Sequence, residues 1–480
     1  METGSTSEPL LDPHMSSVHN TDSPVASSNW PSVLDSLKFL PINNLSSSVA
    51  TQNTVVPSKL CLDASNNAIV TSATTSINID DCIGADITDT GLLTIHAYPQ
   101  SAPKCGSTST KPRPRTYSQS TFQLQSSDAG TLDLPLCNST LLPLLRSLCN
   151  PSSSSNRKYL VLVNPFSGKK QGLKIAQEIV KPMLLQSNIT PIITPTTHPG
   201  HATELMSSPT LLSSYDAIIA VGGDGLLYEM MQGLSHRPDS STFLEQMPFG
   251  IVPAGSGNGL AASVNSVADK FDDTTSNVFV ICKNVPKPAD LSLYDTSEGN
   301  SYASFLSLSW GIVADVDLES EVLRALGSLR FDVYAVWRMI ALKQYRAKLS
   351  YINCEVEMPP IGETVGEDWT TIEDNFLCFW ALQTSHASQG MHTSPASKMD
   401  DGKFHLYIVR GKATRLNLLT SFLAFEDGSH VKQKHMEIIE CTAFRLEPLT
   451  DNSHIDIDGE EVEYGTIQGQ VKAGAWRLFY

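Results

Sequence analysis

The chain is poor in charged residues and has no basic surplus. Charged side chains make up 17% of its 480 residues, below the usual value of roughly 25%. The 33 basic residues are outnumbered by 50 acidic ones, which gives a formal net charge of −17. This balance argues against a general nucleic-acid-binding protein, although it leaves room for a local basic site that holds a small phosphate ligand.

Paired cysteines and long apolar runs are missing as well. The nine cysteines form no CxxC pair, and no His/Cys cluster has the spacing of a zinc site, so we expect reduced thiols in a cytosolic protein. The first residues lack the basic and apolar regions of a secretory signal. No 18 apolar residues run together, as a transmembrane helix would require. We therefore expect a chain that is soluble or that sits on a membrane without crossing it.

The composition and pattern of the sequence change twice within its first third. Residues 1–57 are rich in Ser, Asn, Thr and Pro and too poor in apolar residues to bury a core, so we expect them to be disordered. Short alternating stretches in 58–125 predict a small antiparallel β unit. Residues 126–156 are expected to be a linker.

Two larger domains follow. In 157–287, apolar runs alternate with helical patterns, which predicts a Rossmann-like, three-layer α/β domain with a parallel sheet. In 288–480, the pattern predicts an antiparallel β-sandwich, interrupted by helical insertions at 317–343 and 416–425, with a last strand that could return to the first domain.

Three glycine-rich turns follow predicted strands of the first domain, at 164–169, 222–225 and 253–259. Glycine lets backbone N–H groups approach a phosphate, and the next helix adds a favourable dipole. Each turn alone could be a tight structural connection, but three at one sheet edge favour a nucleotide site. The chain has no Walker P-loop and no protein-kinase motifs, and GSGNG departs from the dinucleotide pattern GxGxxG. Asp224 in the middle turn suits either a helix cap or a general base.

The motifs then resemble a known family. GGDG, with NPxSG upstream and PAGSGN downstream, resembles the diacylglycerol kinase catalytic-domain superfamily. The segment LSLSWGIVADVDLESE (306–321), followed by AFRLEP and IDIDGE, is similar to the sphingosine (long-chain-base) kinases, and this resemblance covers about 157–480. Residues 81–99 resemble the N-terminal β unit of fungal and plant long-chain-base kinases.

The resemblance implies that ATP and Mg²⁺ are cofactors and that the nucleotide lies between the two domains. Asp224 falls on the general base. The implied nucleotide contacts are Asn164, Pro165, Phe166, Thr196, Thr197, His198, Pro199, Gly200, Gly222, Gly223, Gly225, Glu229, Gly255, Ser256, Gly257, Arg324, Arg330, Asp458, Gly459 and Glu460. The residues alone allow plainer interpretations, since Glu321 and Arg324 could form a surface ion pair and Asp458-Gly459 could be a hairpin turn. The magnesium ligands stay open.

The resemblance also implies a hydrophobic tunnel for lipid. Asp317 falls on the acid that receives the amino group of a sphingoid base, and a neutral glycerolipid would leave such a carboxylate desolvated and unpaired. The other implied lipid contacts are Ser307, Leu418, Phe422, Phe425 and His430. On pattern alone, the helix over 416–425 could equally be a core helix.

We therefore predict a lipid kinase that transfers the γ-phosphoryl group of ATP to the primary hydroxyl of sphingosine or a related base. The alternatives are a diacylglycerol or ceramide kinase, a soluble-substrate kinase of the NAD-kinase type, and a catalytically inactive lipid-binding scaffold. The expected partner is a sphingoid-base lipid, with no nucleic acid. The expected location is the cytoplasm, with peripheral association with intracellular or plasma membranes, and a homodimer stays open.

Overall fold

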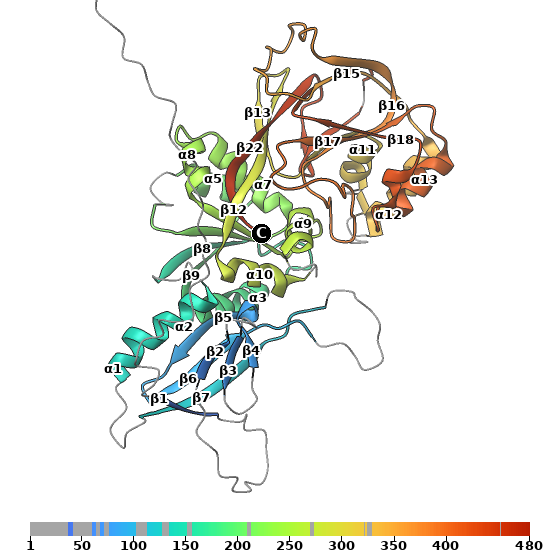
Figure 1. Ribbon diagram of the computed structural model, residues 1–480. Helices are drawn as coiled ribbons and strands as arrows, with labels where there is room; N and C mark the ends of the chain where they lie inside the picture. Colours follow the sequence, from blue (N-terminus) through green and yellow to red (C-terminus); the bar gives the residue numbers. More distant parts are fainter. Residues whose placement is uncertain are drawn as a thin grey trace, which may run out of the picture.

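The computed structural model describes residues 37–41, 60–63, 68–71, 76–101, 113–126, 134–150, 156–208, 213–268, 273–320, 322–323, 329–451 and 453–480. Figure 1 shows an N-terminal unit in blue and teal, a teal-to-green α/β domain and a yellow-to-red sandwich. The predicted fold class is confirmed for these residues. Most of 1–57 lies outside them, and the one described part, strand β1, spans Leu37–Pro41.

The N-terminal unit has a core of its own. Its elements are β1, β2 (Leu60–Asp63), β3 (Ala68–Thr71), β4 (Ser76–Asn78), η1 (Ile79–Asp81), β5 (Cys82–Ile87), β6 (Leu92–Ala97), β7 (Ser118–Ser126), α1 (Leu134–Leu136), η2 (Cys137–Leu141) and α2 (Leu142–Cys149). The strands form two antiparallel sheets, β1-β7-β6-β5 and β2-β3-β4. The region expected to be a linker contains the helical stretch from α1 to α2. This stretch is ordered because Cys137, Leu141, Leu145 and Cys149 recur every fourth residue and bury one face in the core of the unit.

Polar contacts fasten this unit to the α/β domain. Lys283 Nζ donates hydrogen bonds to the carbonyl oxygens of Cys82 (3.0 Å) and Cys149 (2.8 Å). Tyr98 OH donates to Gln186 Oε1 at 2.9 Å. Because carbonyls at the start of β5 and at the end of α2 share one ammonium group, the unit is held firmly against the domain.

The α/β domain is a parallel sheet between two layers of helices. Its elements are β8 (Arg157–Val163), α3 (Gly172–Ile175), η3 (Ala176–Val180), α4 (Lys181–Gln186), β9 (Ile189–Pro195), α5 (His201–Ser207), β10 (Ala217–Gly222), α7 (Asp224–Ser235), α8 (Ser240–Gln246), β11 (Pro248–Pro253), α9 (Gly259–Ala268) and α10 (Thr274–Lys283). The strand order is β9-β8-β10-β11. The apolar runs in β8 and β10 are buried on both faces, as parallel strands require. Helices α3, α4 and α10 cover one face, and α5, α7, α8 and α9 cover the other.

The antiparallel domain is a sandwich with helices on an outer face. Its elements are β12 (Pro286–Thr296), β13 (Ser301–Ser304), β14 (Ser307–Gly311), α11 (Ile312–Glu319), α12 (Leu329–Ala341), β15 (Tyr345–Ile352), β16 (Thr370–Leu382), β17 (Phe404–Arg410), α13 (Arg415–Leu423), η5 (Ser429–Lys432), β18 (Met436–Cys441), β19 (Ala443–Pro448), β20 (Ile455–Ile457), β21 (Glu460–Val462) and β22 (Ile467–Phe479). Side chains alternate between faces along each strand. One face of β14, β16 and β17 lies in the sandwich core, and the other packs under α11, α12 and α13.

The last strand belongs to both domains. β22 pairs antiparallel with β12 and β19, and its end pairs parallel with β11 through Pro248–Arg477 and Phe249–Leu478. The described strands of the two domains therefore form one continuous sheet of 15 strands.

Candidate active site

Four loops leave the parallel sheet at one edge. Strands β8, β9, β10 and β11 are in parallel register, with Val163 opposite both Pro195 and Val221, and Gly222 opposite Pro253. The turns at 164–169, 222–225 and 253–259 and the loop 196–200 therefore begin side by side. The predicted phosphate turns meet at one place, because the carboxyl ends of parallel strands share an edge.

Two of the glycine turns touch each other through their backbones. A Cβ atom on Gly255 would lie 2.4 Å from Gly223 Cα and 2.7 Å from Gly223 N, so neither turn leaves room for a side chain there. The side chain of Asn258, which sequence reasoning did not single out, accepts from Gly255 N at 3.1 Å and donates to Gly255 O at 3.1 Å. Bare backbone thus faces the place where a phosphate would lie.

Asp224 opens helix α7 and caps a different helix. Its Oδ2 accepts from Gly259 N at 2.7 Å and its Oδ1 from Leu260 N at 3.2 Å, both in the first turn of α9. Only 6% of the residue is exposed. Burial raises the pKa of this carboxyl to about 6, although the two backbone N–H groups oppose the rise. A carboxylate that titrates near neutral pH is suited to accept a proton.

The second predicted nucleotide loop lies against α7. Glu229 Oε2 accepts from Ala202 N at 3.3 Å, and Thr203 Oγ1 donates to the carbonyl of Glu229 at 2.9 Å. Thr196 N donates to Val163 O at 2.8 Å, which holds the loop at the end of β8. The structure thus brings Glu229 and the loop 196–200 to the edge where the glycine turns lie.

The DGE motif, at the turn between β20 and β21, joins the second domain to this edge. The buried side chain of Asp458 accepts from Ser304 Oγ (2.6 Å) and from the backbone N–H groups of the three residues after Ser304 (2.9–3.2 Å). Burial raises its pKa to about 7. Glu460 Oε1 lies only 2.8 Å from the position that a Cβ on Gly225 would take. Asp458 therefore fixes the backbone of the segment that leads into β14, while the side chain of Glu460 extends to the first residues of α7.

The two predicted arginines are placed differently. Arg324 lies outside the described residues. Arg330 lies in the first turn of α12, with its guanidinium carbon 4.4 Å from the ring centre of Phe331. Their nucleotide roles stay predictions.

The predicted lipid residues gather on the outer face of the sandwich. Leu418, Phe422 and Phe425 pack with side chains of β16 and β17, and the Phe425 ring lies 6.0 Å from that of Trp380. His430 is fully buried beside Phe425, and its Nε2 lies 2.9 Å from Thr393 O. Burial lowers the pKa of His430, which favours a neutral ring. This apolar layer suits a hydrocarbon chain.

Asp317 lies at the polar end of the same layer. It is a half-buried residue of α11, and its Oδ2 is 3.4 Å from the position that a Cβ on Gly459 would take. Ser307, at the start of β14, follows directly after the loop that Asp458 holds. A carboxylate and a hydroxyl therefore lie between the apolar layer and the DGE turn.

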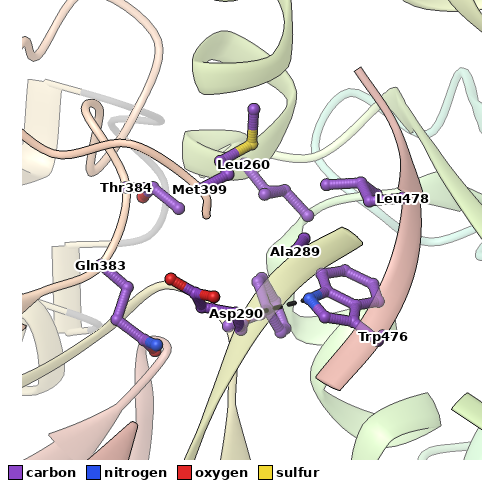
Figure 2. A pocket seen from close by; sticks show the side chains of 9 residues that line it. Leu260, Ala289, Asp290, Gln383, Thr384, Met399, Trp476 and Leu478 are labelled. Carbon is purple, nitrogen blue, oxygen red and sulfur yellow. Dashed lines mark hydrogen bonds between the residues drawn. The ribbon is translucent and has the colours of Figure 1, made fainter. Parts of the chain in front are cut away.

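A small cavity lies between the two domains, behind the sheet edge at which the glycine turns lie (Figure 2). It is bordered by Leu260 and Phe305, whose N–H groups bind Asp224 and Asp458. Gln383 lines the cavity, is 2% exposed, and has no hydrogen-bond partner for either amide atom among the residues that the structure describes. No sequence motif pointed to this residue.

The chain matches two protein-family models. Residues 158–293 match the diacylglycerol kinase catalytic domain, and residues 308–480 match the YegS C-terminal NAD kinase beta sandwich-like domain. Sphingosine kinase 1 of Homo sapiens is 35% identical over 341 residues, which cover 65% of this chain and 88% of that protein. Sphingosine kinase 1 of Arabidopsis thaliana is 33% identical over 340 residues, covering 64% and 69%. Sphingoid long chain base kinase 4 of Schizosaccharomyces pombe is 27% identical over 333 residues, covering 64% and 71%. Together with the glycine turns and the DGE turn, these similarities establish that the chain belongs to the sphingosine kinase family.

Proposed function

We propose that the protein transfers the γ-phosphoryl group of ATP to the primary hydroxyl of a sphingoid long-chain base, with Asp224 as the general base. The observation that carries this proposal is the position of Asp224. Its buried carboxyl, with a pKa raised to about 6, lies among the glycine turns of one domain, next to the turn that the other domain contributes.

The reaction then follows from the geometry. ATP lies with its phosphates against the turns that end β8, β10 and β11, where backbone N–H groups neutralise developing charge. The acceptor hydroxyl approaches from the outer face of the sandwich, and Asp224 accepts its proton as the oxygen attacks the γ-phosphorus. The bond to the β-phosphate oxygen breaks, and ADP leaves. Positioning and charge neutralisation supply most of the acceleration.

Magnesium would enter with the nucleotide and would neutralise part of the charge on the phosphates. Both oxygens of Asp224 already accept backbone N–H groups, so this carboxylate is better suited to take a proton than to ligate the ion. Chelation by EDTA should abolish turnover.

Asp317 supports an amine-bearing acceptor over diacylglycerol or ceramide. A carboxylate beside the apolar layer attracts an ammonium group, which diacylglycerol and ceramide do not carry. The ammonium of a sphingoid base lies close to its primary hydroxyl, so pairing with Asp317 also directs that hydroxyl toward the DGE turn.

The outer surface of helices α12 and α13 supports peripheral contact with a membrane. Within the described ranges, no helix is both long enough and apolar enough to cross a bilayer. The packed helices α12 and α13 nevertheless expose an apolar patch. We name its members, Val333, Trp337, Ile340, Leu416 and Leu423, the α12–α13 patch; each is 52–67% exposed. We propose a cytoplasmic protein that docks through this patch, where a lipid can pass beneath the helices.

Vesicle flotation tests the docking. Leu416→Ser with Leu423→Ser should reduce the fraction of protein bound to phosphatidylcholine/phosphatidylserine vesicles several-fold. Leu449→Ser, which removes an exposed leucine (54%) outside the patch, should leave binding unchanged. Equal binding by both variants would exclude the patch. Sedimentation of the same samples tests the homodimer.

Activity is tested with radiolabelled ATP and a panel of acceptors: sphingosine, sphinganine, phytosphingosine, diacylglycerol and ceramide. Label should appear in the free bases and not in the two neutral lipids. Labelling confined to diacylglycerol or ceramide would overturn the acceptor. An absence of labelled lipid, with ATP binding retained, would favour the inactive scaffold.

A further inference from the structure

The core of the N-terminal unit brings two cysteines together. Cys82 is the first residue of β5 and Cys149 is the last residue of α2, and α2 packs against β5 (Figure 1). Both side chains are fully buried, and both are free cysteines. The thiol of Cys82 donates a hydrogen bond to the sulfur of Cys149. Two segments that are far apart in the sequence therefore meet sulfur to sulfur.

A lysine of the neighbouring domain fixes the backbone at both cysteines. Lys283 Nζ donates to Cys82 O at 3.0 Å and to Cys149 O at 2.8 Å. One ammonium group thus holds the end of α2 against the start of β5. Thiols that already touch on a fixed backbone need only small side-chain rotations to reach the S–S bond length of about 2.0 Å.

The two thiols differ in how readily they ionise. The hydrogen bond from Cys82 lowers the pKa of Cys149, burial opposes this, and the ammonium of Lys283 lowers the pKa further. The pKa of Cys82 is raised, first by its hydrogen bond to Cys149 and then by burial. Burial acting alone raises the pKa of Cys378 to about 12. Because the thiolate is the nucleophilic form, Cys149 is the member of the pair that attacks an oxidant, and Cys82 is the member that keeps its proton.

We propose that Cys82 and Cys149 are a reactive pair that hydrogen peroxide oxidises to an intramolecular disulfide bond. A molecule this small reaches buried groups when the unit opens locally. The thiolate of Cys149 attacks one peroxide oxygen, the O–O bond breaks, and the other oxygen leaves as hydroxide, which takes up a proton. The sulfur of Cys82 then loses its proton and attacks the sulfenic acid on Cys149, and water leaves. Two thiols are oxidised, and one peroxide is reduced to two water molecules.

The bond would strengthen the attachment of the N-terminal unit. It joins β5 to α2 beside the two carbonyl groups that bind Lys283, and Lys283 is the last residue of α10. The oxidised chain therefore presents this carbonyl pair to α10 on a covalently fixed backbone, whereas the reduced chain holds it by packing and hydrogen bonds alone.

Peptide mapping tests the bond in the full chain. The reduced protein is exposed to hydrogen peroxide, its remaining thiols are blocked with N-ethylmaleimide in denaturant, and the digested peptides are identified by mass spectrometry. We expect peptides joined through Cys82 and Cys149, which dithiothreitol separates again. Cys354 is exposed, so its oxidation shows that enough oxidant was present. Oxidised Cys354 without a bond between Cys82 and Cys149 would overturn the proposal.

Three single variants test the pairing and the role of each thiol. In Cys82→Ser, Cys149 has no thiol to react with, so it should gain oxygen as sulfenic or sulfinic acid. In Cys149→Ser, Cys82 should remain a thiol. Cys137→Ser is the matched control, because Cys137 is buried in the same core but lies three helical turns before Cys149, about 18 Å along the stretch. Its disulfide yield should equal that of the parent chain, and a yield as low as that of Cys149→Ser would contradict the pairing.

Hydrogen exchange of the parent chain tests the consequence of the bond. Peroxide should slow the exchange of backbone amides in β5 and α2 several-fold, because opening of the unit then requires two tethered segments to move together. Dithiothreitol should restore the original rates, and Cys149→Ser should show no slowing. Unchanged exchange in a parent chain whose bond has been mapped would overturn the stronger attachment.

Discussion

Asp224 Oδ2 accepts a 2.7 Å hydrogen bond from the backbone N–H of Gly259, so the carboxylate proposed as the base also anchors the first turn of α9. The two interpretations that the sequence leaves open for this residue, a helix cap and a base, therefore coexist in one side chain. A substitution there acts on chemistry and on structure together.

Asp224→Asn removes the proton acceptor and turns one of the two oxygens into an N–H donor that faces another donor. We expect kcat to fall by about 10²–10⁴-fold and the free energy of unfolding to fall by about 1–3 kcal/mol. Single-turnover assays at saturating substrates and urea unfolding measure the two effects. Retention of more than about one tenth of the parent kcat would contradict the role as a base.

The fall of activity at acid pH should reflect the protonation of Asp224. Its pKa is raised to about 6, so the group is protonated and unable to accept a proton below that pH, and ionised above it. We expect kcat/KM for sphinganine to rise with pH up to about 6 and then to level off. Measurements between pH 5 and 8 test this, with melting temperatures taken at each pH. The residual activity of Asp224→Asn should not fall below pH 6 in this way. If kcat/KM of this variant fell over the same pH range, a group other than Asp224 would be responsible for the fall.

Gly255→Ala should separate the two glycine turns that touch. The new Cβ would lie 2.4 Å from Gly223 Cα, and backbone cannot move aside as a flexible side chain can. We expect kcat/KM for ATP to fall by about tenfold or more, because the donors that face the phosphates are displaced. Gly366→Ala is the control, since its Cβ would meet nothing closer than 3.8 Å. If Gly255→Ala and Gly366→Ala had the same kcat/KM for ATP, the close contact between the two glycine turns would be excluded.

Gln383→Leu should stabilise the protein. Both amide atoms of Gln383 are buried without a partner in the described part of the chain, and such a group costs about 1–3 kcal/mol. Leucine fills a similar volume without that penalty, so the melting temperature should rise. Gln468→Leu should lower it, because Gln468 Oε1 accepts from Arg445 Nε at 2.9 Å and from its Nη2 at 2.7 Å. A lower melting temperature for Gln383→Leu would instead indicate a bound water on the amide.

Much of the fold could be read from local patterns. The runs at Tyr159–Val163 and Ala217–Val221 are apolar throughout, as strands buried on both faces must be, and each leads into a turn that contains glycine. The helical stretch 134–149 escaped prediction because its apolar residues are interspersed with Pro, Ser and Asn, and only burial against β5 shows that they share a face.

The site was harder to predict where it depends on contacts between distant segments. The glycine turns carried their own signal, but the clamp of Asp458 on 304–307 joins segments about 150 residues apart. Asp458 did have a local signal: in IDID the acids alternate with Ile455 and Ile457, which face the sandwich core. That alternation indicates that Asp456 and Asp458 point the other way, but it cannot reveal Asp317 beside them.

Because β22 pairs with strands of both domains, the order in which the chain is synthesised affects its folding. Until residues 467–480 have been synthesised, β11 lacks the neighbour that covers its outer side, and the sheet of the α/β domain has an unpaired edge there. Residues 157–287 expressed alone would keep that edge and tend to aggregate. The nucleotide half of this enzyme thus folds fully only after β22 of the lipid half has been synthesised, and no ATP-binding fragment should accumulate before the strands of the acceptor site exist.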